Sequence, residues 1–377
     1  MARRLRLIAT VALGTEDLCA NELRALGLPG VRQLKGAVEF RGQLIEGLHA
    51  CLSLRTAMRV LLPLAQVPAP DATGLYEGLR TIAWTEHLNL RTTFAIDVSG
   101  ETENLTHSLF VAQKAKDAIV DTLREKLGGR PSVDRSHPDV RVVLHLHKGQ
   151  ADVSLDLAGD SLHRRGYRRG QHPAQLKETL AAAVLLAVGY GGEGTLCDPM
   201  CGSGTLAIEA GFLAQNRPPN LEREFGCERW PSFGESQREA LADLRSRLRS
   251  ELRPQTAIII ASDRDPEATE ATKINARAAG VRVLVREADA RELSPLSPPG
   301  LIVVNPPYGG RIGGGGGKKQ LKSFYHALGA RWRLLAGHEI AVLSGAPEFE
   351  SAFGMKPRHR RVLYNGPLKC ELLTYRV

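Results

Sequence analysis

Long apolar runs and paired cysteines are both missing from this chain of 377 residues. A membrane-spanning helix needs about 18 or more apolar residues in a row, whereas the longest candidate, residues 180–188, is much shorter and rich in alanine. We therefore expect no membrane partner. The six cysteines are scattered and include no C-x-x-C pair. We expect neither a disulfide framework nor a bound metal, but reduced thiols in a cytoplasmic protein.

The glycine-rich segment 311–319, "RIGGGGGKK", also lacks the pattern of a nucleotide-phosphate loop. That motif requires a glycine, four residues, and then Gly-Lys followed by Ser or Thr. Counting back from Gly317 places Ile312 at the first position, and Lys319 stands where the hydroxyl is required. Nucleotide hydrolysis is therefore disfavoured, and residues 313–317 are predicted by composition to form a flexible loop.

Positive charge is in moderate excess, with 50 Lys and Arg against 41 Asp and Glu. A net charge of +9 suits a polyanionic partner. The segment "HRRGYRR" (163–169) adds a local cluster, because Arg forms forked bonds with phosphate and stacks on bases. A solvated loop is the alternative. The residues predicted to contact nucleic acid are Arg164, Arg165, Arg168 and Arg169.

The hydrophobic pattern predicts three domains, and a hydrophobic fraction of 43% allows each a core. Residues 1–60 and 61–165 are both predicted to be small α+β units. The first has strands at 6–13 and 38–42 and helices at 15–27 and 44–57, and the second has strands at 93–100, 140–149 and 151–159 and a long amphipathic helix at 108–128.

The third predicted domain, residues 166–377, has a different pattern. After a helix at 174–189, buried strands alternate with helices, and the strands are at 194–200, 257–263, 283–289, 301–307 and 338–345. This alternation predicts an α/β fold with a parallel, doubly wound sheet of the Rossmann-like type.

The segment "CDPMCGSGTLAIEA" (197–210) follows the first of these strands and opens a helix. Gly202 and Gly204 permit a tight turn and close approach of the backbone to a ligand, and Ser203 and Thr205 can cap the helix. Such a turn is the usual nucleotide site of a doubly wound sheet. A dinucleotide site is disfavoured, because the third glycine of its motif is missing and the next acidic strand comes much later.

Polar residues also follow the next three strands of this sheet. Asp263 is placed to accept bonds from a ribose diol, and Asp289 from an adenine amino group. The fourth strand ends in "NPPY", Asn305 to Tyr308. Ligands bind such sheets at the carboxyl ends of the strands, so we expect these side chains and the glycine loop to form one site.

The residue types of the Asn-Pro-Pro-Tyr segment suit transfer to an aromatic amine. Such an amine is a poor nucleophile, because its lone pair is delocalised into the ring. The Asn305 side-chain oxygen and the carbonyl of Pro306 can both accept from it, hold the nitrogen in place, and favour its pyramidal form as positive charge develops. Pro307 adds rigidity. Tyr308 is predicted to stack on the extruded base.

With these residues noted, "DPMCGSGT" and "NPPYG" resemble the amino-methyltransferases that use S-adenosylmethionine. More of the chain is similar to the THUMP-containing methyltransferases that make N2-methylguanosine in 23S ribosomal RNA: "DLAGDSLHRRGYR" (156–168), "NRPPNLEREFGCERWPSF" (216–233) and "VLYNGPLKCELLTY" (362–375). The resemblance covers nearly the whole chain. It implies a ferredoxin-like segment, then a THUMP domain, then the catalytic domain.

The resemblance also implies roles for single residues. Asp198, Gly202, Ser203 and Gly204 would line the methionine end of S-adenosylmethionine. Asp263 would hold its ribose and Asp289 its adenine, while the residues from Asn305 to Tyr308 would hold the guanine. The expected partner is structured RNA, most simply 23S ribosomal RNA or a large-subunit precursor, bound by a monomer.

Two other functions stay open at this point. The same chemistry serves guanine N2 in transfer RNA and adenine N6, because "NPPY" suits both amines. A non-catalytic RNA-binding factor of ribosome assembly is the third reading, and the intact Asn305 and glycine loop argue against it.

Overall fold

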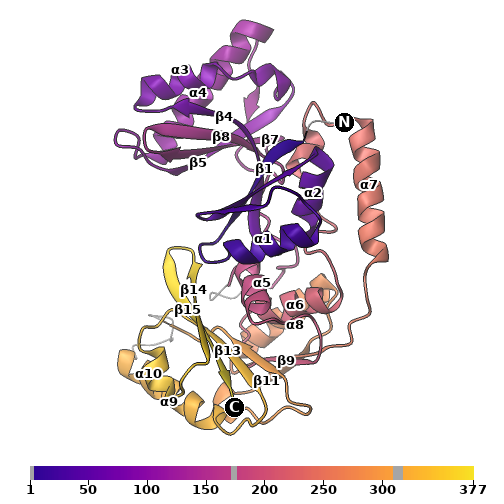
Figure 1. Cartoon of the computed structure of the whole chain (residues 1–377), viewed down its shortest axis with the longest axis vertical. Coiled ribbons are helices and arrows are strands. Elements are labelled where there is room, and N and C mark those ends of the chain that lie inside the picture. Colours follow the sequence, from indigo (N-terminus) through magenta and orange to yellow (C-terminus); the bar gives the residue numbers. More distant parts are fainter. Residues whose placement is uncertain (1–3, 171–175, 309–316) are drawn as a thin grey trace.

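The computed structural model describes residues 4–170, 176–308 and 317–377 (Figure 1). Most of the predicted glycine-rich loop 313–317 lies outside these residues. The described residues form two sheets, one of eight strands and one of seven. The sheets belong to two lobes stacked along the long axis of the molecule (Figure 1). No helix within the described ranges is long and apolar enough to cross a membrane.

The first lobe is built on a continuous eight-stranded sheet. In chain order its strands are β1 (Leu5–Val11), β2 (Arg32–Leu34), β3 (Ala37–Gly42), β4 (Ala57–Pro68), β5 (Thr93–Gly100), β6 (Ser132–Val133), β7 (Val140–His147) and β8 (Gln150–Asp156), and their spatial order is β2-β3-β1-β4-β8-β7-β5-β6. Its helices are α1 (Glu16–Ala25), α2 (Leu44–Ser53), α3 (Ala72–Arg80) and α4 (Ser108–Leu127), with a 3₁₀ turn η1 at Trp84–Glu86.

Strand β4 joins the two predicted α+β units. Its first residues pair with β1 and the remainder pair with β8, both antiparallel. The division predicted between residues 60 and 61 therefore falls inside one strand. The pattern did not predict β4, because Pro63 interrupts it, and the register shift between Pro63 and Ala65 is the irregularity that accommodates this proline. Strand β2 and helix α3 were also not predicted.

The second lobe has the expected doubly wound sheet. Its strands are β9 (Thr195–Asp198), β10 (Ile258–Asp263), β11 (Leu284–Glu287), β12 (Leu301–Val304), β13 (Glu339–Ser344), β14 (His359–Asn365) and β15 (Leu368–Arg376), in the order β11-β10-β9-β12-β13-β15-β14. The first five are parallel, as predicted. The antiparallel hairpin β14–β15, which pairs with β13, was not predicted.

Helices flank this sheet. They are α5 (Glu178–Ala187), α6 (Thr205–Ala214), α8 (Pro266–Ala279), α9 (Lys318–Trp332) and α10 (Phe349–Phe353), with a 3₁₀ turn η3 (Ala290–Glu292). The segment between α6 and β10 contains a further helix, α7 (Glu235–Ser250), and a 3₁₀ turn, η2 (Gly226–Arg229).

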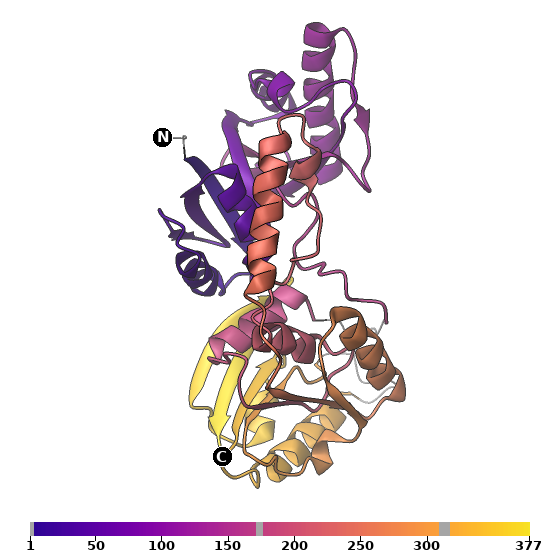
Figure 2. The same cartoon turned by 90° about the vertical axis from the view of Figure 1, so that its right-hand side faces the viewer.

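Helix α7 lies beside the first lobe, although its sequence neighbours belong to the second (Figure 2). Its apolar face, Leu241, Leu244 and Leu248, is buried in the hydrophobic core of the first lobe, together with Phe225 and Trp230 from the preceding loop. A fragment consisting of residues 166–377 would expose this apolar face to water. The two lobes therefore share part of one core.

We predict that Leu241→Ala lowers the free energy of unfolding by about 2–5 kcal/mol, the usual cost of truncating a buried leucine. Leu252→Ala is the matched control, because Leu252 lies just beyond the same helix and is 39% exposed. Urea unfolding of both variants checks this. Equal and small effects would show that α7 is not packed on the first lobe.

Candidate active site at the carboxyl edge of the second sheet

A cavity of about 800 Å³ lies at the carboxyl ends of β9, β10, β11 and β12. The structure brings most of the predicted site residues to it. Those that line the cavity are Asp198, Gly202, Asp263, Asp289, Asn305, Pro306 and Pro307. They come from four strand ends spread over more than 100 residues of sequence, and the parallel sheet places them at one edge.

The glycine loop between β9 and α6 has the tight geometry that its sequence predicts. Gly202 and Gly204 have φ values of +53° and +82°, which L side chains rarely adopt. A Cβ atom at Gly204 would also lie 2.7 Å from Cγ2 of Thr272. The Gly202 amide donates to Oδ2 of Asp263 at 3.0 Å, so the second strand end holds the loop of the first.

The expected cap of α6 is different. Gly204, not Ser203 or Thr205, is the N-cap residue, and no side chain caps the helix. Ser203 is buried and is absent from the cavity lining. Its hydroxyl accepts a hydrogen bond from Arg168, and the contact of Ser203 with the cofactor stays a prediction.

Asp198 is a buried carboxyl group facing the cavity. Burial raises its pKa to about 8, and the negative charge of Asp263 adds to the rise, while the Met200 amide, 3.2 Å from Oδ1, opposes it. A carboxyl group that is costly to ionise without a partner suits a cationic ligand, whose charge would offset the cost of burial.

The carboxylates of the other two acidic residues, Asp263 and Asp289, accept hydrogen bonds from different kinds of donor. Asp263 accepts one backbone amide on each oxygen, from Gly202 and Asp265. Asp289 forms a bidentate pair with Arg291, with the shorter contact at 2.5 Å, and this pair lowers the pKa of Asp289. A ligand amine at Asp289 would therefore compete with Arg291, which also lies over the ring of Phe324.

Asn305 is part of the cavity wall and has an unused acceptor. Its Oδ1 atom is buried and has no hydrogen-bond partner among the residues that the structure describes, an arrangement that is costly and uncommon in folded proteins. Helix α9 holds the proline pair that follows Asn305, because the Pro307 carbonyl accepts a hydrogen bond from the Tyr325 hydroxyl at 2.6 Å. A ligand that donates a hydrogen bond would satisfy Asn305.

Tyr308 does not have the position predicted for it. Its ring is only 5% exposed and does not line the cavity. The ring lies against Gly345, and its hydroxyl accepts from Asn365 of β14 at 2.9 Å. Stacking on a base requires an open ring face, and the buried ring of Tyr308 offers none in this structure, so its contact with a base stays a prediction. The tyrosine instead joins the motif to the C-terminal hairpin.

Two of the four arginines predicted to contact nucleic acid are bound to protein groups in the structure: Arg165 is buried and Arg168 is partly buried. The Arg165 side chain is 0% exposed, donates to the carbonyls of Leu162 and Arg55, and lies 3.7 Å from Glu209. Tyr167 is buried too and donates to Glu209. Arg168 is tied to Glu178 at 2.6 Å. These side chains belong to the segment 163–169, the connector between the lobes. Because they bind protein groups, they are not available to phosphates.

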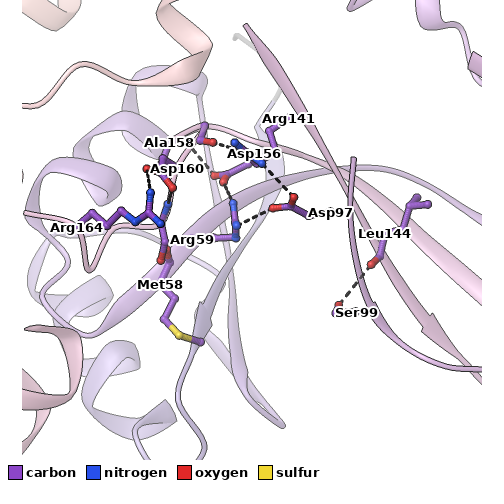
Figure 3. A network of polar contacts seen from close by, with 12 residues as sticks. Met58, Arg59, Asp97, Ser99, Arg141, Leu144, Asp156, Ala158, Asp160 and Arg164 are labelled. Atoms are coloured by element: carbon purple, nitrogen blue, oxygen red, sulfur yellow. Dashed lines mark hydrogen bonds and ion pairs between the residues drawn. The ribbon is translucent and has the colours of Figure 1, made fainter. Parts of the chain in front are cut away.

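Arg164 and Arg169 are exposed, as expected of phosphate contacts. Arg164 pairs with Asp160, at 3.0 Å, next to the network in which Arg59 bridges Asp97 and Asp156 on the first sheet (Figure 3). The Arg59 network is part of the sheet surface, and its two carboxylates raise the pKa of Arg59.

Several cavity residues were not predicted from the sequence. On α9 they recur with helical spacing: Gln320, Ser323, Phe324 and Ala327. This period was visible in the sequence, but nothing in it showed which helix face meets the cavity. Arg264 and Arg291 also line the cavity, and no motif marks them.

Comparison with known proteins agrees with this geometry. A family model described as an RMKL-like methyltransferase domain matches residues 165–374. Models of an RlmL ferredoxin-like domain and of a THUMP domain match residues 6–61 and 69–156. Ribosomal RNA large subunit methyltransferase K/L of Syntrophotalea carbinolica is 39% identical over 98% of this chain and 53% of that protein. The chain thus spans about half the length of the curated relatives it matches.

Two solved structures are similar over nearly the whole chain. A methyltransferase complexed with SAH, SMU.472, has a TM-score of 0.87 and 29% identity, covering 100% of this chain and 99% of that one. A protein from Listeria monocytogenes, described as a predicted N6-adenine-specific DNA methylase, has a TM-score of 0.84 and 28% identity over 99% and 96%.

We predict that Tyr308→Ala destabilises the fold by about 3–5 kcal/mol, as for other buried aromatic residues. Tyr308→Phe should cost only about 1 kcal/mol, because it removes one hydrogen bond, to Asn365. Thermal unfolding of the two variants measures both values. Near wild-type stability of Tyr308→Ala would show that the ring is not part of the core.

Proposed function

Because this chain belongs to the family of RMKL-like methyltransferase domains, we propose that it transfers a methyl group from S-adenosylmethionine to the exocyclic N2 of a guanine in 23S ribosomal RNA. The observation that carries the proposal is the buried Oδ1 of Asn305, which has no partner within the described part of the chain, in a cavity lined on another side by the glycine loop. The curated relatives, which bear the name ribosomal RNA large subunit methyltransferase K/L, support the choice of substrate.

The donor set of the cavity fits S-adenosylmethionine. When bound, this cofactor supplies a methyl group activated by a sulfonium. The Asp198 carboxylate would accept from its ammonium group, beside the backbone of Gly202. Asp263 retains acceptor capacity for the ribose hydroxyls, because each oxygen is used by one amide only. Asp289 would accept from the adenine once Arg291 has moved aside.

Asn305 and Pro306 would act on the target amine. Two acceptors, the amide oxygen and the Pro306 carbonyl, orient both N–H bonds, so the nitrogen lone pair is directed at the methyl group. The attraction grows as positive charge develops on nitrogen, which lowers the barrier to the chemical step. The rigid proline pair and the bond from Tyr325 to Pro307 hold these acceptors in place before the base arrives.

The first lobe would bind the RNA. It carries the match to the THUMP model. Arg164 and Arg169, on the connector next to it, retain the phosphate role proposed from the sequence. We propose that the enzyme acts as a monomer, because the RNA lobe and the cavity belong to one chain. We propose the cytoplasm as its location.

A second candidate, methylation of adenine N6, has one observation in its favour. The Listeria monocytogenes neighbour is named as an N6-adenine methylase, and an asparagine acceptor suits either amine. Guanine N2 in transfer RNA stays open for the same chemical reason. A non-catalytic assembly factor is disfavoured, because a structural role gives no reason to leave Asn305 unpaired.

We predict that Asn305→Ala lowers single-turnover methyl transfer by at least about 100-fold, the effect of removing one preorganised transition-state partner. Cofactor affinity should change little, because Asn305 faces the amine. Transfer of labelled methyl groups to unmodified large-subunit RNA, followed by nucleoside analysis, measures this. Asn21→Ala, at an exposed position of α1, is the control.

Near-normal turnover of Asn305→Ala would overturn its assigned role. N6-methyladenosine as the product would replace guanine by adenine as the substrate.

We predict that the affinity for S-adenosylmethionine rises with pH, up to about tenfold per unit below pH 8, and levels off above it. Asp198, with a pKa of about 8, is mostly protonated below that pH, and the cationic ligand binds the ionised form. Calorimetry from pH 6 to pH 9 checks this. Asp198→Asn should bind more weakly and with a flat profile, so a wild-type affinity independent of pH would contradict the assignment.

A further inference from the structure

Arg168 lies between the connector and the glycine loop, and its guanidinium is almost fully used. Nε donates to Glu178 at 2.6 Å, and Nη1 donates to the Ser203 hydroxyl at 3.1 Å. Nη2 donates to the Leu176 carbonyl at 2.6 Å and to the Thr205 hydroxyl at 3.1 Å. One side chain therefore holds both hydroxyl groups of the Gly-Ser-Gly-Thr loop.

Two of these partners are part of the cavity wall. Leu176 and Thr205 both line the cavity, whereas Arg168 itself does not. Arg168 thus acts on the cavity only through other residues. Its partner Glu178 is buried at the start of α5, so the guanidinium is anchored on the side away from the loop.

A second residue makes the same connection by a different route. Asn275 of α8 is fully buried, and its Oδ1 accepts from the backbone amides of Arg169 and Gly170. Its Nδ2 donates to the carbonyls of Gly170 and Ser203. Arg168 and Asn275 therefore each link the connector to the glycine loop.

We propose that Arg168 is a positioning residue for the cofactor loop and that, with Asn275, it links the RNA-binding lobe to the methyl-donor site. This inference rests on the proposed function of the cavity. The loop has two glycines with positive φ and no side-chain cap on α6, so its own sequence holds it weakly. The bonds from Arg168 restrict it to the conformation that lines the cavity.

The same contacts explain why Arg168 does not serve as a phosphate contact. Its side chain is 21% exposed, and four of its five N–H donors are directed at protein acceptors. An RNA phosphate could be bound only by giving up these bonds. Loss of Arg168 should therefore affect the cofactor, with RNA affinity unchanged.

The test measures cofactor affinity by calorimetry and RNA affinity at two salt concentrations, on the full chain. Arg168→Gln should weaken S-adenosylmethionine binding about tenfold or more, from the loss of several hydrogen bonds, and raise its KM more than it lowers kcat. The salt dependence of RNA binding should be unchanged. Arg249→Gln is the matched control, because Arg249 forms an equally short 2.6 Å pair with Glu222, exposed to solvent.

Arg168→Gln leaves Glu178 buried without its partner, which could prevent folding. The double variant Arg168→Gln/Glu178→Gln removes both charges and should show the same cofactor defect at near wild-type melting temperature. Ser203→Ala keeps the ion pair intact. It should weaken cofactor binding severalfold alone and have no further effect in the Arg168→Gln background, since both changes break the same contact.

Unchanged cofactor affinity in Arg168→Gln, with weaker RNA binding and a salt slope reduced by about one, would overturn the proposal and make Arg168 a phosphate contact. Additive effects of Ser203→Ala and Arg168→Gln would also overturn it. Failure of the wild-type chain to bind S-adenosylmethionine would instead refute the proposed function of the cavity.

Discussion

The position of one lobe relative to the other depends on a buried cluster of charged side chains from which water is excluded. Arg165 and Glu209 form its centre, and both side chains are 0% exposed. Arg165 donates to the Arg55 carbonyl at 2.5 Å, and Arg55 donates to the Arg217 carbonyl at 2.9 Å. Removing one partner of a buried charge pair costs about 3–5 kcal/mol. The buried pair therefore holds the path of the chain out of the first lobe, and this path brings Arg168 to the glycine loop.

Two further contacts fix the lobes relative to each other. Helix α7 places the apolar side chains of the second lobe's insertion in the core of the first. At the other side, Arg361 of β14 donates to the Gly14 carbonyl at 2.6 Å. A binding surface on the first lobe thus stays at a set distance from the cavity. For the proposed selection of one base in a large RNA, such a fixed distance would be a physical source of specificity.

The cavity concentrates the features that are unfavourable for stability. Asn305 has a buried acceptor without a donor, and Asp198 is held where ionisation is costly. By contrast, the support behind them is well satisfied, as in the bonds of Asn275 and of Tyr325. Folding energy from the surrounding contacts holds these groups in place, and a ligand with matching charge and donors would relieve the cost. Functional sites typically combine unpaired or costly polar groups in the cavity wall with well hydrogen-bonded residues around them.

The parallel sheet, and the edge of it at which Asp198, Asp263 and Asn305 meet, could be predicted from the sequence. Periodicity locates a buried strand, and the residue that follows a parallel strand must lie at its carboxyl edge. The sequence did not predict β4, where Pro63 interrupts the pattern, or the fact that α7 packs on the other lobe.

Whether a polar side chain faces the cavity or pairs with other protein groups depends on its contacts in the folded chain. The basic sequence around Arg165 and Arg168 suggests an exposed segment. In the structure these residues pair with Glu209 and Glu178, which come from later helices. Tyr308 follows the predicted strand, yet Asn365, far along the chain, holds it in the core. A local pattern records the chemistry of a side chain but not its neighbours from distant segments, and burial and pairing depend on those neighbours.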